Sequence, residues 1–204
     1  MFINTLLFIA APLTAQEVAP ITPTEPAKQA KGWQIDVGYI NVSVDEEGGE
    51  DLAGFNFNAR KLLSNPTGAV RTSFEFGISN FSRSETYTSG PYSQTWDVTA
   101  FEFRAGVDAA FIIPESKGHV QPYVGAGLSY ISADASTYGA RGSAEDTSSD
   151  VGLYAKLGLR VLFKPEAATS PFLDLGFRKT FGHEDDYDGS LDYTALIASV
   201  GVSF

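Results

Sequence analysis

The chain has 204 residues, with 14 basic and 25 acidic side chains and a formal net charge of −11. Because it contains no cysteine, it has no disulfide framework, thiolate metal site or cysteine nucleophile. The acidic balance argues against a surface that binds nucleic-acid phosphates, so no nucleic acid partner is expected. The mean hydropathy of −0.06 is that of an ordinary soluble protein, but a membrane barrel with two alternating faces averages to a similar value.

Two N-terminal segments precede the fold. Residues 1–15 contain an apolar run, 6–11, followed by a proline and a small-residue end at 14–15, which is the pattern of a secretory signal peptide with an approximate cleavage site. An N-terminal helix or a buried strand is the alternative, and the run is shorter than the roughly 20 apolar residues of a membrane-spanning helix. Residues 16–32 hold three prolines and little to bury, which predicts an extended arm.

From residue 33 onward, apolar residues alternate with polar ones or glycine. The clearest segment is 151–163, where every odd position is apolar and the even positions include Lys156 and Arg160. Successive side chains of a strand point to opposite faces, so this segment has one wholly apolar face. The same pattern predicts eight strands, at about 33–44, 52–63, 69–83, 94–113, 120–133, 150–163, 171–181 and 190–204.

The connections between these strands strictly alternate in length. Short, proline-containing connections alternate with polar and generally longer ones. The short ones are 64–68, 114–119 and 164–170, and the others are 45–51, 84–93, 134–149 and 182–189. This alternation predicts an antiparallel up-and-down sheet with both termini on the side of the short turns.

The composition of the two rows decides which face is inside. The row opposite the apolar one collects most of the glycines of the strands together with balanced charges, as expected in a narrow eight-stranded interior that side chains just fill. The predicted fold is therefore an all-β, eight-stranded antiparallel up-and-down transmembrane β-barrel with a polar, side-chain-filled interior and an apolar, lipid-facing exterior. A soluble, lipocalin-like ligand-binding barrel is the alternative. The lumen charges are Asp36, Arg60, Arg71, Glu75, Glu102, Arg104, Asp108, Lys156, Arg160, Asp174 and Arg178.

Two stretches of residues 33–204 resemble the small OmpA/OmpX-type barrels of the bacterial outer membrane. The last strand, with Leu196, Ala198, Val200, Val202 and Phe204, resembles their C-terminal assembly signal, and 121–130 (QPYVGAGLSY) is similar to one of their strands. The resemblance implies insertion by the barrel assembly machinery, a periplasmic N-terminal arm and acidic extracellular loops. Because the chain ends at the barrel, no peptidoglycan-binding domain is implied.

The lumen charges allow two interpretations. Their ion pairs either rearrange to open a narrow gated path for small ions, or form a satisfied plug that holds the barrel closed. Eight strands leave little free bore, which favours the plug. In either case no charge is expected to stay unpaired, since an unpaired buried charge costs several kcal/mol.

Residues 45–51, 84–93, 134–150 and 182–189 carry a summed formal charge of −13, more negative than the whole chain. Acidic runs of this kind are usually solvated surface. They also suggest that the connections bind divalent cations, which would bridge the protein to anionic lipopolysaccharide. The weak metal candidates are Glu184, Asp186 and Asp188, spaced as in an EF-hand loop, although Ala195 stands where that loop has its bidentate glutamate.

An enzyme that modifies lipid A would use a histidine with a serine and a carboxylate. Only His119, in a short turn, and His183, beside Glu184 and Asp185 and near Ser190, are available. We therefore expect no enzymatic activity, no catalytic residues and no cofactor.

The expected role is structural or surface-interacting. Residues 84–93 and 134–149 are rich in Ser, Thr, Tyr and Gly, which suits adhesive contacts. The expected partners are outer-membrane lipids and lipopolysaccharide, and a monomer is expected.

Overall fold

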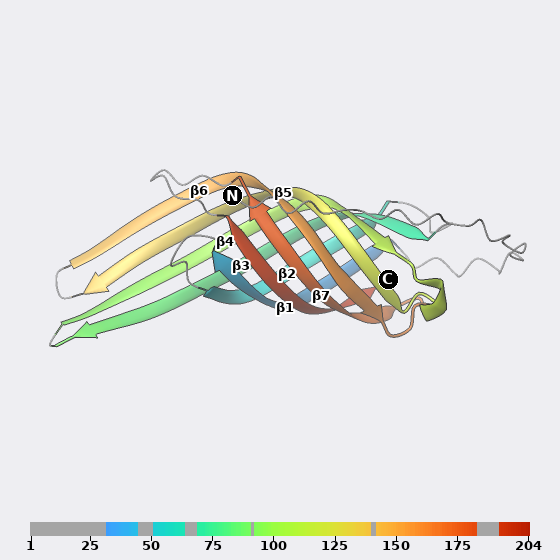
Figure 1. Ribbon diagram of the computed structural model, residues 1–204, viewed down its shortest axis with the longest axis horizontal. Helices are drawn as coiled ribbons and strands as arrows, with labels where there is room; N and C mark the ends of the chain where they lie inside the picture. The colour runs from blue at the N-terminus through green and yellow to red at the C-terminus, as the bar shows by residue number, and fades with distance from the viewer. Residues whose placement is uncertain (1–31, 45–50, 64–68, 91, 140–141, 183–191) are drawn as a thin grey trace, which may run out of the picture.

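Eight antiparallel strands close into a barrel in which β1 pairs with β8 (Figure 1). The computed structural model describes residues 32–44, 51–63, 69–90, 92–139, 142–182 and 192–204. The strands are β1 (Trp33–Val44), β2 (Asp51–Leu62), β3 (Val70–Ser89), β4 (Tyr92–Phe111), β5 (Val120–Gly139), β6 (Gly142–Leu162), β7 (Ser170–Phe181) and β8 (Tyr193–Ser203). In these residues the one helix is a single 3-10 turn, η1 (Pro114–Ser116), and none is long or apolar enough to cross a membrane.

The period-two pattern of the sequence determines which side chains form the two faces of the wall. On β4, Phe101, Phe103 and Val107 are about half exposed on the outside, whereas Glu102 and Arg104 point inward and are buried. At this level of the wall the interior is therefore polar and the exterior apolar. A soluble barrel requires the opposite arrangement, because it buries its apolar row away from water.

The barrel is closed by hydrogen bonds between the first and last strands. The pairing of β1 with β8 runs from Gln34–Ser203 to Val44–Tyr193. Beyond it, the backbone N–H groups of Trp33 and Phe204 each donate to the carbonyl of the other residue, at 2.9 Å. The start of β1 and the end of β8 therefore lie at the same end of the barrel, here called the terminal end. The opposite end is called the hairpin end.

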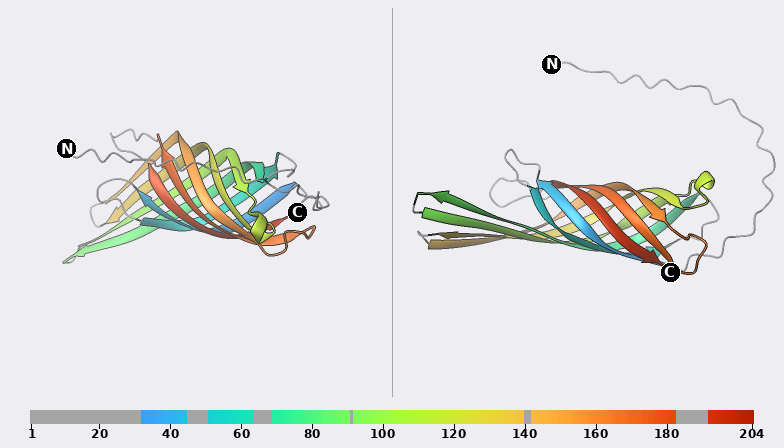
Figure 2. Two further views of the ribbon diagram at one scale, coloured as in Figure 1. Left: turned by 45° about the vertical axis from the view of Figure 1, so that its right-hand side comes forward. Right: turned by 90° about the horizontal axis from the view of Figure 1, so that it is seen from below.

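At the hairpin end the structure corrects two predicted loops. Segments 84–93 and 134–149, expected as loops, are largely strand: β3 pairs with β4 as far as Ser89–Tyr92, and β5 with β6 as far as Gly139–Gly142. The pairing of β2 with β3 stops at Ala53–Ser82. Strands β3 to β6 therefore run past the barrel rim as two long hairpins (Figure 2). We call their outer parts, 83–89, 92–98, 133–139 and 142–150, the projecting sheet.

The other strand limits agree with the sequence prediction within two or three residues. The fourth strand ends at Phe111 rather than at 113, and β8 begins at Tyr193 rather than at 190. At the tight turns of the projecting sheet, Gly90 and Gly142 have φ values of 62° and 126°, a region of backbone conformation that side chains with a Cβ rarely adopt.

Candidate functional site

The lumen contains all the charged residues that the sequence placed there. Ten of them are buried, five carboxylates and five bases. These are Asp36, Arg60, Glu75, Glu102, Arg104, Asp108, Lys156, Arg160, Asp174 and Arg178. Because the two signs are equal in number, the buried charges can form a neutral plug.

Arg60 is the centre of the ion-pair cluster nearer the terminal end. Its guanidinium group forms ion pairs with Asp36, with Glu75 at 2.6 Å and with Asp108 at 3.2 Å. The Lys156 ammonium group bonds to Glu75 and lies 2.9 Å from Asp108. Two bases therefore pair with three carboxylates, two of which they share, and these pairs tie β1, β2, β3, β4 and β6 together across the lumen.

Arg160 extends this cluster toward β7 and β1. It bonds to the Asp174 carboxylate at 2.8 and 3.0 Å and to the Gln34 amide oxygen at 2.7 Å. The Tyr123 hydroxyl donates to Asp174 at 2.6 Å, and the Arg160 guanidinium lies 5.1 Å from the centre of the Tyr123 ring. Aromatic rings and amides, which the sequence interpretation did not assign a role, thus complete the contacts of the charges.

A second cluster lies nearer the hairpin end and centres on Glu102. Its carboxylate bonds to Arg104 and, at 2.7 Å, to Arg178. Asn58 joins the two clusters, because its amide donates to Asp36 at 2.7 Å and accepts from Arg104 at 3.0 Å. The buried charges therefore form one continuous network, as the plug interpretation expects.

Lumen glycines make room for these large side chains. A Cβ on Gly77 would collide with the Arg104 guanidinium group, and one on Gly158 or Gly176 would collide with the Tyr123 hydroxyl. This confirms the steric reason for glycine on the inner row.

An apolar cluster, which the sequence interpretation missed, fills the lumen nearer the hairpin end. We call it the apolar layer. It consists of Ile40, Val42, Leu52, Phe81, Ala100, Ile131, Tyr193 and Ala195. Ile40 and Val42 have the same parity as Asp36, so continuing the inner row along β1 is the signal that reveals it. A layer of apolar side chains above paired charges opposes the passage of ions.

Arg71 is the exception among the eleven predicted lumen charges. It lies at the start of β3, at the terminal end, and is only half-buried. Its Nε and Nη1 atoms are buried without a hydrogen-bond partner in the part of the chain that the structure describes. The lumen thus carries one base more than its network uses, and the prediction that every lumen charge is paired is wrong for Arg71 within these residues.

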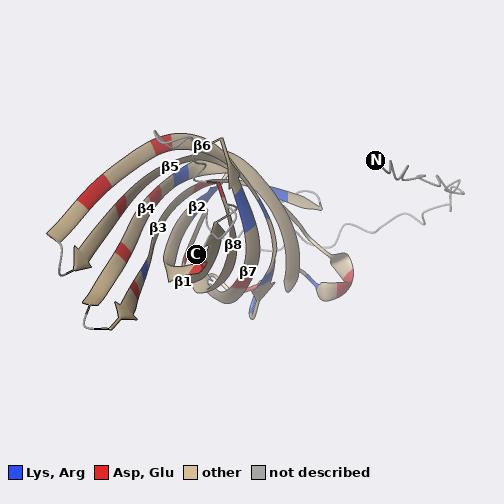
Figure 3. Cartoon of the chain, turned by 60° about the vertical axis from the view of Figure 1, so that its left-hand side comes forward, with Lys and Arg blue, Asp and Glu red and all other residues tan. Residues whose placement is uncertain are grey.

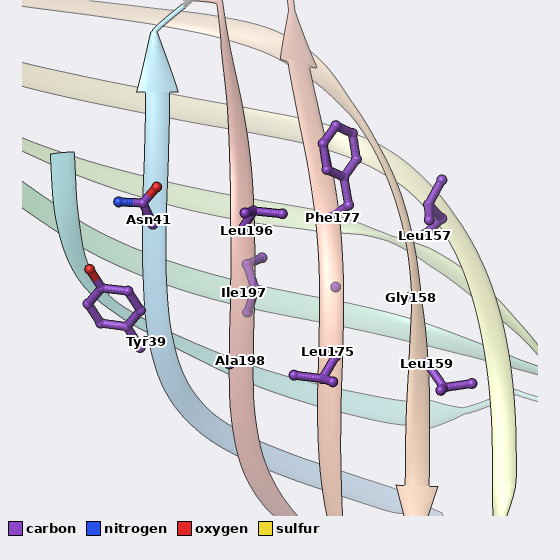
Figure 4. A pocket seen from close by; sticks show the side chains of 11 residues that line it. Tyr39, Asn41, Leu157, Gly158, Leu159, Leu175, Phe177, Leu196, Ile197 and Ala198 are labelled. Carbon is purple, nitrogen blue, oxygen red and sulfur yellow. The ribbon is translucent and has the colours of Figure 1, made fainter. Parts of the chain in front are cut away.

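The predicted assembly residues all face outward on β8. Leu196 and Val200 are 59% and 60% exposed, and Phe204 is 39% exposed. Leu196 and Ala198 help to line an apolar groove of about 740 Å³ on the outer wall, beside Leu175 and Phe177 (Figure 4). Their outward orientation is compatible with recognition during insertion, but the role itself stays a prediction.

The projecting sheet is polar on both faces. Its inner face continues the lumen row and carries Tyr87, Tyr92 and Trp96, while its outer face carries mainly Ser and Thr. Acidic residues recur along the hairpins (Figure 3). Residues 83–98 and 133–152 together hold six carboxylates and two guanidinium groups, so the sheet is a negatively charged surface.

The remaining candidates lie elsewhere. The His119 Nδ1 atom lies 2.8 Å from the Leu162 carbonyl oxygen. Four residues lie outside the described ones: His183, Glu184, Asp186 and Asp188. The signal peptide at 1–15 and nearly all of the arm at 16–32 also lie outside them. In the described residues, no three His, Asp or Glu side chains gather as metal ligands would.

Comparison with known proteins identifies the fold. Residues 5–204 match the model of a family described as outer membrane protein beta-barrel domain. No curated protein sequence matches the chain.

Solved structures of small outer-membrane proteins are similar to the chain. One is Ail, the attachment invasion locus protein of Yersinia pestis, in complex with the heparin analogue sucrose octasulfate. It has a TM-score of 0.51 and 18% identity, over 84% of this chain and 97% of that one. Neisserial surface protein A has a TM-score of 0.53 and 17% identity, over 85% and 96%. At these identities the likeness shows the fold.

Proposed function

Because the chain belongs to the outer membrane protein beta-barrel family, we propose that it is a closed barrel of the bacterial outer membrane that presents the projecting sheet for surface interactions. The observation that carries this proposal is the projecting sheet itself: four strands continue past the rim of a barrel whose interior is filled. In this proposal the hairpin end lies outside the cell and the terminal end in the periplasm.

Two features of the lumen support a closed barrel. The ten buried charges form a connected network, and the apolar layer lies between it and the hairpin end. The test is single-channel recording in planar bilayers. The wild-type chain should give no steady current. Steady currents that Arg104→Ala abolishes would overturn the proposal and establish the gated path instead.

Two features of the projecting sheet support an interaction role. Among the described residues, 84–89 and 142–147 have an edge that no other strand pairs with, because β2 and β7 pair only up to Ser82 and Leu153. Free edges can add a strand from a partner. Tyrosine, serine and glycine at its tips supply rigid contact area and adaptable hydrogen bonds. The similar protein Ail was solved with a heparin analogue, but the acidic sheet of this chain disfavours such a polyanion.

A shortened variant tests the interaction role. Replacing 86–95 and 136–145 each by Asn-Gly keeps the register, because Glu85 pairs with Trp96 and Ala135 with Asp146, and Asn-Gly forms a two-residue hairpin turn. Bacteria that display this variant should adhere to epithelial monolayers less than bacteria that display the full chain. Equal surface amounts and an unchanged heat-dependent gel shift are the controls. Unchanged adherence would contradict the interaction role.

Assembly is the proposed role of the last strand. Deletion of Phe204 should lower the outer-membrane yield, because it removes the outward aromatic ring and the backbone bonds that close β8 on Trp33. Phe163→Ala is the matched control, since Phe163 is also an exposed aromatic residue. An unchanged yield after deletion would contradict recognition of this residue by the barrel assembly machinery.

We further propose a monomer without enzymatic activity or a cofactor, surrounded by outer-membrane lipids and lipopolysaccharide. Mass spectrometry of lipid A from cells with and without the protein should show the same acyl chains, and a lost or gained chain would establish a lipid A-modifying enzyme. Calcium calorimetry with no heat at millimolar calcium would remove Glu184, Asp186 and Asp188 as a calcium site.

A further inference from the structure

A groove of about 560 Å³ lies between the tips of the two hairpins. It is lined by Tyr87, Ser89, Tyr92, Ser93, Gln94, Gly139 and Gly142. Four of these residues form one row across the projecting sheet, because Tyr87 pairs with Gln94, Gln94 with Gly139 and Gly139 with Gly142. All four belong to the inner face, so the groove is open toward the space above the barrel.

The Tyr87 ring is held in place by its neighbours on β3. Its hydroxyl group donates a hydrogen bond to the Glu85 carboxylate, which also forms an ion pair with Arg83. The ring itself remains 58% exposed. Tyr92, on the next strand, is 59% exposed. The groove therefore presents two aromatic rings to solvent, and one of them is preorganised, which lowers the entropy lost on binding.

The other described residues of the lining are uncharged and able to form hydrogen bonds. Gln94 offers an amide donor and acceptor, and Ser89, which has inner-face parity, offers a hydroxyl group. The row ends in Gly139 and Gly142. Because these two residues have no side chains, they leave the groove open opposite the tyrosines. A Cβ on Gly142 would have no atom within 4 Å. Flat rings beside a polar, side-chain-free floor suit a ligand with both apolar faces and hydroxyl groups.

The charge of the projecting sheet limits which classes of ligand the groove can bind. The carboxylates of the projecting sheet repel sulfated, phosphorylated or sialylated ligands. A basic peptide would need a free carboxylate in the groove. Glu85, the acidic side chain of the inner face nearest to Tyr87 along β3, is already bonded to Arg83 and Tyr87. The lining thus favours a ligand without formal charge.

We propose that this groove binds a neutral oligosaccharide, whose sugar rings stack on Tyr87 and Tyr92 and bond to Gln94 and Ser89. This proposal rests on the proposed function, because it names the class of ligand that the projecting sheet contacts.

The test is binding of the full chain in lipid nanodiscs to immobilised probes. The probes are neutral hexose and N-acetylhexosamine oligosaccharides, their sulfated and sialylated counterparts, and a hexalysine peptide. Neutral oligosaccharides should bind, with little change between about 0.05 and 0.5 M salt, since no ion pair is involved. Binding of the anionic probes or hexalysine alone would overturn the proposal, as would the absence of any bound neutral sugar.

Single substitutions locate the site. Tyr92→Ala should weaken neutral oligosaccharide binding about fivefold to tenfold, because one stacking ring is lost. Tyr87→Phe should weaken it less, about twofold, because the ring remains but its bond to Glu85 is lost. Tyr138→Ala is the matched control: Tyr138 is also exposed near the tip of a hairpin but has outer-face parity, and its loss should leave binding unchanged. Equal effects of Tyr92→Ala and Tyr138→Ala would overturn the assignment to this groove.

The two proposals fail separately. If shortening the hairpins abolishes adherence while Tyr92→Ala preserves both adherence and sugar binding, the projecting sheet is the interaction surface but this groove is not its sugar site. If shortening leaves adherence unchanged, the proposed function itself fails.

Discussion

Strands β3 to β6 pass through two different surroundings along their length. Inside the barrel wall, Phe103 and Arg104 are neighbours in sequence, yet one is half exposed on the apolar exterior and the other is buried among carboxylates. Beyond the rim, Thr95 and Trp96 also point to opposite faces, but both faces are open. Strand pairing continues unchanged across this boundary. Hydrogen bonding between strands therefore holds the sheet together on both sides of the rim. Apolar and polar residues alternate only where the two faces of the sheet meet different surroundings.

The same contrast separates stability from interaction. The wall encloses shared ion pairs and an apolar layer, so changes there should disturb the folded barrel. The projecting sheet buries little, so changes there should alter binding and leave the barrel intact. The following predictions test this division, beginning with the largest effect.

Arg60→Ala should destabilise the barrel by about 3–5 kcal/mol, the range found when one partner of a buried ion pair is removed. The substitution leaves Asp36, Glu75 and Asp108 with too few bases. Urea unfolding of the protein in detergent micelles measures the loss. Lys61→Ala is the control, because Lys61 is exposed and lies 5.0 Å from the centre of the Trp33 ring. Equal losses for the two variants would contradict the structural role of the network.

Phe81→Ala should cost about 3 kcal/mol, because it opens a cavity in the apolar layer. Phe81 is 2% exposed and packs edge-on against Tyr193 at 5.5 Å between ring centres. Phe101→Ala removes the same side chain from the 45% exposed outer wall and should cost clearly less. The urea unfolding midpoints of the two variants, measured under the same conditions, give the comparison. A larger loss at Phe101 would show that the apolar layer is not a packed core.

Arg71→Ala should change stability by no more than about 1 kcal/mol, in either direction, because it removes donors that lack a partner among the described residues. It is the matched opposite of Arg60→Ala: an inward-facing arginine at the terminal end that, within the described residues, takes no part in the ion-pair network. The same urea titration measures it. A loss as large as that of Arg60→Ala would place Arg71 inside the charge network.

The sequence predicted the eight strands and the inward row because lipid and lumen impose opposite demands at successive residues. It failed at 84–93 and 134–149 for the same reason. Where water lies on both sides, Ser, Thr, Tyr and Asp occupy both faces, and a polar segment without alternation was interpreted as a loop. The residues themselves, such as Thr86, Thr95 and Trp96, are good strand formers. Propensity would have been the better guide at these positions.

The site was predicted in composition but not in arrangement. All eleven lumen charges follow from parity along single strands, and the structure brings ten of them into one buried network. Their partners depend on the register between strands, which no local pattern specifies. Asp36, for example, meets Arg60 from β2 and Ser199 from β8. The apolar layer was missed because Ile40 and Val42 were not followed along the inner row.

Amide hydrogen exchange along β3 to β6 tests the central claim most directly, because one experiment covers the wall and the projecting sheet of the same strands. We expect protection to fall in a step near Ser82, with amides of 83–89 and 142–150 exchanging at least about 100-fold faster than those of 74–81, since they open without unfolding the barrel. Equal protection from the wall to the hairpin tips would contradict the account.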